Sequence, residues 1–133
     1  MFKIIVAIGM FLLSSAVRAD DVRKIDFTAV LTDQDGDPMR ECSDKPLPAD
    51  LQNCKTYRLI TLGLVALGAL VTQEPGQTPE TVVLRGELGL RLYKATAVVL
   101  TPEEIVLLKT LIAKRYNTLI GYRAFRLIDP TVR

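Results

Sequence analysis

The sequence contains no histidine and no tryptophan, and its only serine after Ser15 is Ser43. Without histidine, neither a serine triad nor a cysteine–histidine pair can be assembled. Glu103 and Glu104 are neighbouring carboxylates, but adjacent side chains on a helix point in different directions, and a capping role explains both. A hydrolase that brings two carboxylates together from distant segments is the remaining catalytic alternative. We therefore expect that the protein is not an enzyme and uses no cofactor.

Cysteine occurs only twice, at Cys42 and Cys54, on either side of a polar loop that contains Pro46 and Pro48. An even number of cysteines at this spacing predicts one disulfide in an oxidising compartment. Closing a loop of this size contributes roughly 3 kcal/mol in the chain-entropy model. Free or metal-bound thiols are the alternative, but no histidine or third cysteine is present to complete a zinc site. We expect a disulfide and no metal.

The first 19 residues have the three parts of an export signal. Lys3 provides a basic start, an apolar run extends from Ile4 to Leu13, and small residues at Val17 and Ala19 predict cleavage before Asp20. An apolar helix of that length spans about 15 Å of the roughly 30 Å hydrocarbon core. A membrane anchor or a buried N-terminal helix is therefore the weaker alternative. We predict a signal peptide over residues 1–19, a single domain over residues 20–133, and a periplasmic or secreted protein without a stable membrane anchor.

The charges balance overall but are unevenly distributed along the chain. The 17 basic and 15 acidic residues give +2, and removal of Lys3 and Arg18 with the signal peptide leaves 15 of each sign. A neutral domain lacks the field that attracts nucleic acid, so we expect no nucleic-acid partner. Residues 20–50 hold nine acidic and four basic residues, whereas residues 51–133 hold six and eleven. We expect the acidic segment to lie on or near the basic helical part; recruitment of different partners by the two halves is the alternative.

Residues 24–31 are rich in strand-forming side chains and lead into a dense turn pattern over residues 32–38, with a hairpin that returns through Met39 to Cys42. Acidic residues of this region occupy positions 1, 3, 5, 9 and 12 of a calcium-binding EF-hand loop, namely Asp33, Asp35, Asp37, Glu41 and Asp44. Position 6, which requires glycine for a sharp turn, is Pro38, and no helix leads into the loop. We expect a solvated hairpin turn rather than a calcium site.

The stretch 59–72 is apolar on all sides and uncharged, which predicts a core helix capped by Thr61. The small residues Gly63, Ala66 and Ala69 give this helix a slim face against which a neighbouring helix can pack.

A second helix is predicted from Thr78–Pro79–Glu80 to about residue 95. Its expected buried stripe consists of Leu84, Leu88, Leu92 and Ala95. We expect Glu87 and Arg91 to form an exposed pair one turn apart.

The run Thr101–Pro102–Glu103–Glu104 is a capping box and predicts a helix to about Asn117. Its expected apolar face consists of Ile105, Leu108, Leu111, Ile112, Tyr116 and Leu119. Residues 96–100 predict a short strand that pairs near Phe27, and residues 119–128 predict a final helix. The expected fold is therefore α+β, with about four helices and a small sheet of two or three strands.

Five basic residues gather in the last third of the chain: Lys109, Lys114, Arg115, Arg123 and Arg126. They either face an acidic partner or phosphate groups, or form a solvated helix face. We expect the solvated face and keep the five as candidate partner-facing residues.

The order of several segments resembles that of small uncharacterised proteins encoded in tailed phages and prophages. The segments are Asp26–Asp33 with Asp35–Pro38, then Leu59–Gly63, Leu100–Ile105 leading to Tyr116, and the ending Leu127–Pro130. This resemblance implies a phage-derived accessory or assembly protein and supplies no catalytic residue. The chain differs from that pattern in its export signal and its cysteine-bracketed loop, and a particle assembled in the cytoplasm has no use for an exported subunit.

These observations favour a small exported interaction protein of the bacterial envelope or extracellular space whose partner is another protein. A structural or assembly accessory protein of phage or prophage origin is the alternative. The sequence does not predict an oligomeric state.

Overall fold

The computed structural model describes residues 22–131, which form an α+β fold with four α-helices and two small antiparallel sheets. The predicted fold class is confirmed, although the strands form two separate pairs rather than one sheet. The signal peptide predicted over residues 1–19 lies outside the described residues. In chain order, the elements are β1 (Arg23–Asp26), β2 (Arg40–Cys42), the 3-10 helix η2 (Leu51–Asn53), β3 (Tyr57–Leu59), α1 (Leu62–Val71), α2 (Pro79–Leu92), β4 (Ala97–Leu100), α3 (Pro102–Arg115) and α4 (Thr118–Ile128).

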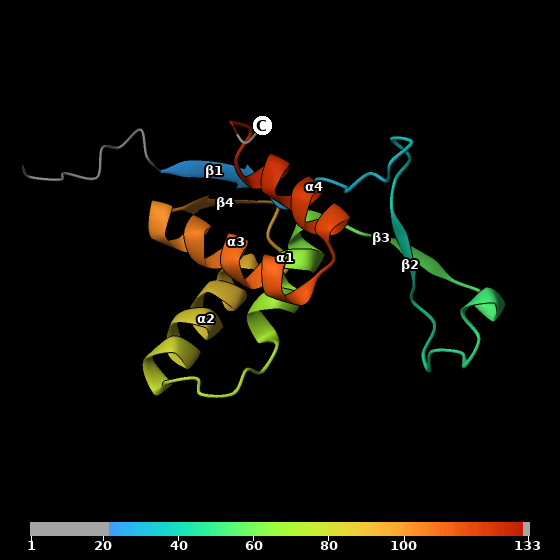
Figure 1. Cartoon of the computed structure of the whole chain (residues 1–133), viewed down its shortest axis with the longest axis horizontal. Helices are drawn as coiled ribbons and strands as arrows, with labels where there is room; N and C mark the ends of the chain where they lie inside the picture. The colour runs from blue at the N-terminus through green and yellow to red at the C-terminus, as the bar shows by residue number, and fades with distance from the viewer. Residues whose placement is uncertain (1–21, 132–133) are drawn as a thin grey trace, which may run out of the picture.

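The helices and one strand pair form a body around α1 (Figure 1). α1 packs against α2, α3 and α4, and the β1–β4 pair adjoins α4. As predicted, the strand over residues 97–100 pairs near Phe27: Ile25 lies opposite Val98, and the Phe27 N–H donates to the Thr96 carbonyl at 2.9 Å. The largest fully buried side chains all belong to this body, namely Phe27, Leu31, Leu62, Val65, Leu88, Leu100, Leu108, Ile112 and Ile128.

Polar side chains begin all four helices as N-caps. Thr61, Thr78 and Thr101 each accept a hydrogen bond from a backbone N–H three residues on, and Asn117 does the same for α4. The capping box of α3 is complete, because the Glu104 side chain accepts from the Thr101 N–H at 3.1 Å. Each cap satisfies one of the N–H groups that a helix start leaves without a partner.

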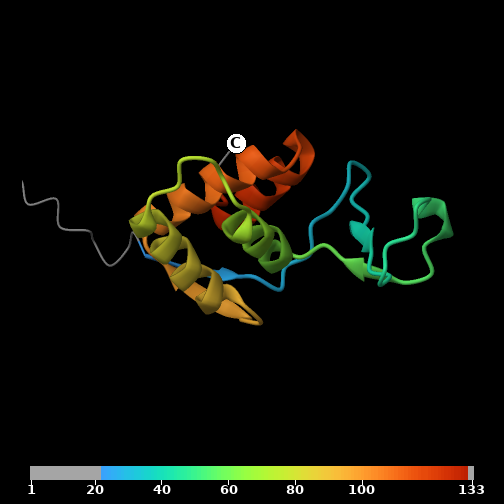
Figure 2. The ribbon, with the colours of Figure 1, turned by 90° about the horizontal axis from the view of Figure 1, so that it is seen from below.

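Residues 32–60 form an arm that projects from the body (Figures 1 and 2). The arm contains an acidic turn, β2, a loop with η2, and β3, and Arg40 of β2 lies opposite Leu59 of β3. None of its residues is buried. Of the arm's side chains, only the half-buried Met39 and Ile60 pack against the hydrophobic core of the body.

The strand predicted over residues 24–31 is shorter than expected, because Asp26 interrupts it. Its carboxylate accepts hydrogen bonds from the Thr28 N–H at 2.9 Å and the Thr28 hydroxyl at 2.6 Å. This local turn competes with the strand ladder, so β1 ends at Asp26. The chain then rejoins extended structure through an isolated bridge between Val30 and Thr61.

The predicted core helix over residues 59–72 begins later, at Leu62, with Thr61 as the predicted cap. Leu59 belongs to β3 instead, because its backbone pairs with β2. The slim face meets a chain turn as well as helices: the Gly63 N–H donates to the Phe27 carbonyl at 2.9 Å, and a Cβ added at Gly63 would lie 3.0 Å from that oxygen. Gly63 thus allows the segment after β1 to approach α1 closely.

The buried face of α2 differs from the predicted stripe. Leu84 is 49 % exposed, whereas Arg85, Leu88, Gly89 and Leu92 are buried. The expected Glu87–Arg91 pair is absent from the described ion pairs, since Arg91 turns to Glu104 of α3 at 2.5 Å. The helix also ends before residue 95, where Lys94 takes a left-handed conformation with φ of 55°.

Candidate protein-binding arm

The arm is closed by the predicted disulfide between Cys42 and Cys54, whose Cα atoms are 5.9 Å apart. Cys42 is the last residue of β2, and Cys54 follows η2, so the bond closes the loop that extends beyond the strand pair. Disulfides persist in oxidising compartments and are rare in the cytosol. The bond therefore indicates an oxidising location outside the cytoplasm.

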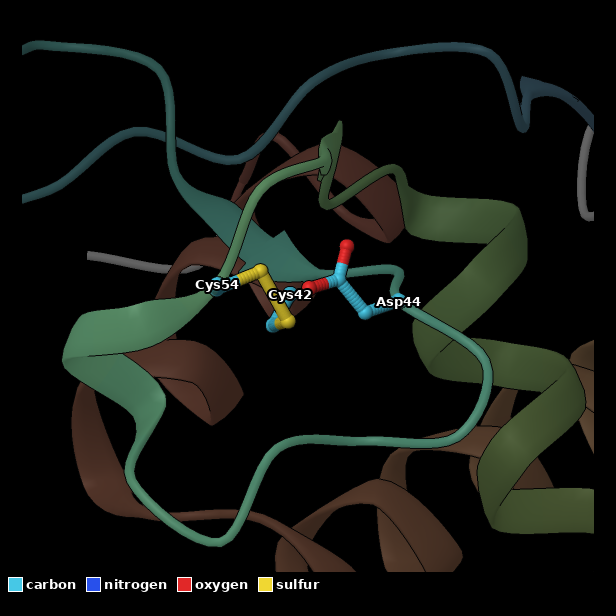
Figure 3. Close-up of side chains that lie close together, drawn as sticks. All are labelled: Cys42, Asp44 and Cys54. Atoms are coloured by element: carbon cyan, nitrogen blue, oxygen red, sulfur yellow. A yellow bond between two sulfur atoms is a disulfide. The ribbon is translucent and has the colours of Figure 1, made fainter.

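The Asp44 side chain lies beside the disulfide and stabilises the same loop (Figure 3). Its carboxylate accepts hydrogen bonds from the Lys55 N–H at 2.9 Å, from the Thr56 N–H at 2.8 Å and from the Thr56 hydroxyl. The Thr56 hydroxyl and the Lys55 N–H hold the pKa of Asp44 below its usual value. The carboxylate thus works as a charged acceptor that ties the two sides of the loop together next to the disulfide.

The strand pair below the disulfide carries its own polar contacts. Arg58 of β3 forms an ion pair with Glu41 of β2 at 2.5 Å, and the Ser43 N–H donates to the Thr56 carbonyl at 2.9 Å. These contacts and the disulfide take the place that a buried core has in the body.

Apolar side chains on the arm face solvent. Leu47 and Leu51 in the closed loop are each 64 % exposed, and Tyr57 and Leu59 of β3 are exposed as well. Single exposed apolar residues are ordinary on a protein surface, but here they occur on a braced projection with no core beneath them. A rigid projection that presents leucine and tyrosine side chains can insert them into a groove of another protein.

The acidic region at the base of the arm forms the hairpin turn that the sequence predicts. The Asp33 carboxylate accepts hydrogen bonds from the Asp35 and Asp37 N–H groups, both at 2.9 Å, and Gly36 has a positive φ of 85°. Carboxylate oxygens of these three aspartates lie within 4.8 Å of one another; Asp35 and Asp37 are exposed, and Asp33 is half-buried.

The five acids of the EF-hand numbering do not converge on one point. Glu41 pairs with Arg58, and Asp44 is held by Thr56 and Lys55. Asp44 also lies within 4.8 Å of Cys42 and Cys54, but both sulfur atoms are joined in the disulfide and are not available as thiolate ligands.

The predicted basic residues lie on α3 and α4, mostly against neighbouring side chains. Lys109 is 3.6 Å from Asp129, and Lys114 is 3.8 Å from Glu74. Arg123 donates to the Asp33 carbonyl at 2.8 Å, which links α4 to the base of the arm. The Arg115 guanidinium carbon lies 5.7 Å from the centre of the Tyr116 ring. Arg126 lies on the exposed side of α4.

Three of these cations each face an aromatic ring: Lys109 faces Phe125, Arg115 faces Tyr116, and Arg123 faces Tyr122. The three rings line one hollow of about 300 Å³ at the junction of α3 and α4. Each of these three cations thus lies over one ring of the hollow, while Arg115 and Lys114 also line a second hollow beside Glu74.

Within residues 22–131, the acidic segment lies near the basic helices where Arg123 of α4 donates to the Asp33 carbonyl, but the described ion pairs do not join its carboxylates to those helices. Of the ion pairs described there, only Glu41–Arg58 joins an acid from residues 20–50 to a base from residues 51–133, and both residues belong to the arm. The physical reason is local, because backbone N–H groups of the turn and the loop already satisfy Asp33 and Asp44.

Sequence reasoning missed Arg85, which is only 2 % exposed. Its guanidinium donates to the carbonyls of Leu70 at 3.0 Å, Ala69 at 2.9 Å and Thr72 at 2.6 Å. These are the unpaired carbonyls at the end of α1, where a cation also complements the helix dipole. Hydrophobic periodicity gives no sign of such a residue, since the pattern places Leu84 in the core instead.

None of the helices within residues 22–131 has the length and apolarity that a membrane crossing requires. Comparison of the chain with protein-family models, with curated proteins and with solved structures found no match. Inference about function therefore depends on the geometry of the chain itself, and the arm is its most distinctive feature.

Proposed function

We propose that the chain is an exported, non-enzymatic interaction protein of the bacterial envelope or extracellular space, which binds another protein through its arm. The observation that carries the proposal is the arm itself: a projection without buried residues that is nevertheless braced by a disulfide and by Asp44. Such bracing contributes little to the core of the body, but it holds an exposed surface in one shape.

Preorganisation is the physical advantage of this design. A flexible loop loses conformational entropy when it binds, at roughly 0.5–1.5 kcal/mol for each side chain that becomes immobilised. The disulfide, the Asp44 hydrogen bonds and the Glu41–Arg58 pair restrict the arm before binding. More of the contact energy of Leu47, Leu51 and their neighbours is then available for affinity.

The disulfide supports the extracytoplasmic part of the proposal, and the export signal predicted over residues 1–19 supports it independently. Whether the protein works in the periplasm or outside the cell depends on the partner. The absence of histidine and the arm's purely structural use of Asp44 support a binding role rather than catalysis.

Capture experiments with matched variants test this proposal. The oxidised protein from Asp20 onward is immobilised and exposed to the envelope fraction of the source cells, alongside a Leu47→Asp/Leu51→Asp variant. Val106→Asp is the control, because Val106 on α3 is 63 % exposed, as open as the two leucines, but lies on the body. We expect a specific protein that is retained by the wild type and by the control and lost with the arm variant. Equal capture by all three proteins would refute binding through the arm.

A further inference from the structure

β3 has an open backbone edge on the side that faces away from β2. The two strands form a sheet of their own, so β3 is paired on one side only. The Ser43 N–H donates to the Thr56 carbonyl at 2.9 Å, and hydrogen-bonded pairs recur at every second residue of an antiparallel ladder. In this register, Glu41 and Arg58 form the next hydrogen-bonded pair. The backbone groups of even-numbered residues along β3 therefore face β2, and those of odd-numbered residues face away.

Tyr57 and Leu59 are the odd-numbered residues of β3, so each directs its N–H and its carbonyl to the outer edge. The chain before the arm does not cover this edge, because it pairs on the side of β2. There the Ile60 N–H donates to the Met39 carbonyl and the Ile60 carbonyl accepts from the Leu31 N–H, both at 2.9 Å. Within residues 22–131, no hydrogen bond reaches the four outward groups of Tyr57 and Leu59. Their spacing is that of a strand, and an extended chain is the structure that pairs with such an edge.

The side chains of β3 differ between its two faces. Side chains alternate along a strand, so Tyr57 and Leu59 share one face, where both are exposed. Arg58 lies on the other face, in its ion pair with Glu41. An incoming strand that matches both faces has apolar side chains on the first and a polar side chain on the second.

Arg58 determines the charge of that polar side chain. Its Nε and Nη2 atoms lie 2.6 Å and 2.5 Å from the same Glu41 oxygen. Its Nη1 atom has no partner among the described residues, and the side chain is 55 % exposed. Side chains directly opposite each other on antiparallel strands interact, and opposite charges are favourable there. An acidic side chain opposite Arg58 is therefore favoured.

A second copy of the chain is a poor occupant of this edge. Two β3 edges use all four outward groups when they pair antiparallel with Arg58 at the centre. This register places the two Arg58 side chains directly opposite each other, where like charges are destabilising. The edge thus suits a strand from a different protein.

From these observations we infer that the arm binds its partner by strand addition, in which an extended segment of the partner protein pairs antiparallel with the outer edge of β3. The segment carries apolar side chains opposite Tyr57 and Leu59 and an acidic side chain opposite Arg58. This inference rests on the proposed binding role of the arm and specifies the chemistry that the arm recognises. In this mode of recognition, main-chain hydrogen bonds provide affinity and alternate side chains provide specificity.

The test is NMR of the oxidised protein from Asp20 onward with the peptide KTVEVTK, blocked at both ends. When its glutamate lies opposite Arg58, the N–H groups of its two valines face β3. We expect the amide signals of Tyr57 and Leu59 to shift as peptide is added to millimolar concentration. N-methylation of both valines should abolish these shifts, whereas N-methylation of the glutamate, whose N–H faces away, should preserve them.

Three results would overturn the inference. The first is the absence of a shift at the two amides, and the second is an equal response to both methylated peptides. The third is a shift that appears when the concentration of the protein alone is raised, since this would show pairing between copies of the chain.

Proline at position 59 tests the edge from the side of the protein. Leu59→Pro removes an outward N–H that the ladder to β2 does not use, so the fold should be retained. The variant should bind the peptide at least roughly tenfold more weakly than the wild type, because a hydrogen bond is lost and the ring blocks the edge. Leu59→Ala retains the N–H and should have a smaller effect. Unchanged amide signals of the body confirm folding, and equal binding by the two variants would contradict strand addition.

Charge exchange tests the role of Arg58. The wild type should bind KTVEVTK more tightly than KTVKVTK, because lysine places a like charge opposite Arg58. The double variant Glu41→Arg/Arg58→Glu retains the ion pair of the arm and should reverse this preference. The same preference in both proteins would refute recognition of an acidic side chain by Arg58.

The capture experiment described above separates this inference from the proposed function. If the wild type and Leu59→Pro capture the same partner equally, the arm binds a protein but strand addition is wrong. If the peptide binds at β3 while the wild type captures no partner, the edge accepts a strand but the proposed function is wrong.

Discussion

The body and the arm are held together by different means. The body buries Phe27, Leu62, Leu108 and other apolar side chains around α1, whereas no residue of the arm is buried. The arm depends on a disulfide, on the Asp44 carboxylate and on an ion pair between β2 and β3. One chain therefore combines a fold stabilised by burial with a projection stabilised by covalent and polar contacts.

This difference shows how a small protein can keep apolar side chains exposed to solvent instead of burying them in its core. If Leu47 and Leu51 were held by packing, they would be buried and unavailable to a partner. Cross-links within the arm fix its shape and leave these side chains outside.

The largest effect is expected from the core of the body. Leu108→Ala removes a fully buried side chain of α3 and should lower the free energy of unfolding by about 3 kcal/mol. Leu51→Ala makes the same chemical change on the arm and should alter it by less than about 0.5 kcal/mol, because Leu51 is already exposed. Chemical denaturation of both variants measures the difference. Similar losses would show that the arm shares the core.

The second-largest effect is expected from a buried polar side chain of the body. Arg85→Met leaves the carbonyls of Ala69, Leu70 and Thr72 without their charged donor and should cost about 2 kcal/mol. Arg85→Lys retains the charge but has fewer donors and should recover part of that loss. Thermal and denaturant unfolding give the comparison. If both variants matched the wild type, the hydrogen bonds from Arg85 would not stabilise the C-terminal end of α1.

Removal of the disulfide should affect the arm far more than the body. In the Cys42→Ser/Cys54→Ser variant, amide hydrogen exchange should rise for Ser43 and Thr56, which pair across the loop, while α1 and α3 stay protected. The global free energy of unfolding should fall by less than the roughly 3 kcal/mol of the chain-entropy model, because the arm loosens in the native state too. Uniform loss of protection in arm and body would contradict this separation.

Acidification should produce the smallest effect. Hydrogen bonds from the Thr131 hydroxyl and N–H, together with Arg23, hold the pKa of Asp129 at about 2, below the ordinary value of 3.8. Because the pKa is lower in the folded state, this contribution is complete above the ordinary value and is lost as the pH falls toward 2. Asp129→Asn should therefore flatten the decline of the thermal midpoint in that window. A variant with the same decline as the wild type would refute the assignment.

Asp44 provides the counterpart on the arm, since its pKa is lowered in the same direction. Its protonation should raise amide exchange of Lys55 and Thr56 at low pH before α1 and α3 respond. Exchange measured along an acid titration distinguishes this local loosening from unfolding of the body.

The helices of the body could be predicted well because their signals are local. Thr101 and Glu104 form the expected capping box, and the predicted caps Thr61 and Thr78 also begin helices. The buried positions Ile105, Leu108, Leu111 and Ile112 follow the period of α3. In these segments, propensity, capping and hydrophobic spacing agree.

The errors arise where tertiary contacts override the local pattern. Leu84 continues an apolar stripe in the sequence, but Arg85 is buried instead because its guanidinium reaches the end of α1. The apolar pattern predicts that Leu59 begins a helix, but its backbone pairs with β2 and forms part of a strand. Neither outcome can be read from spacing along a single segment.

The arm shows the limit of sequence reasoning about the site. The spacing of Cys42 and Cys54 predicted the disulfide, but it gave no sign that the enclosed loop stands away from the core. The spacing of the acidic residues places Asp44 at position 12 of a calcium-binding loop, whereas in the structure its carboxylate accepts hydrogen bonds from Lys55 and Thr56. Both the projection of the loop and the hydrogen bonds of Asp44 depend on the pairing between β2 and β3. The amino-acid composition of the segment does not predict that pairing.

The most direct test of an exported, disulfide-braced binding protein is the intact mass of the chain in fractionated source cells. Thiol alkylation is carried out with and without prior reduction. We predict that the exported fraction contains a chain that begins at Asp20, with Cys42 and Cys54 alkylated only after reduction. A full-length chain in the cytosol, with both thiols alkylated without reduction, would contradict the account and favour the alternative of a phage-derived assembly protein.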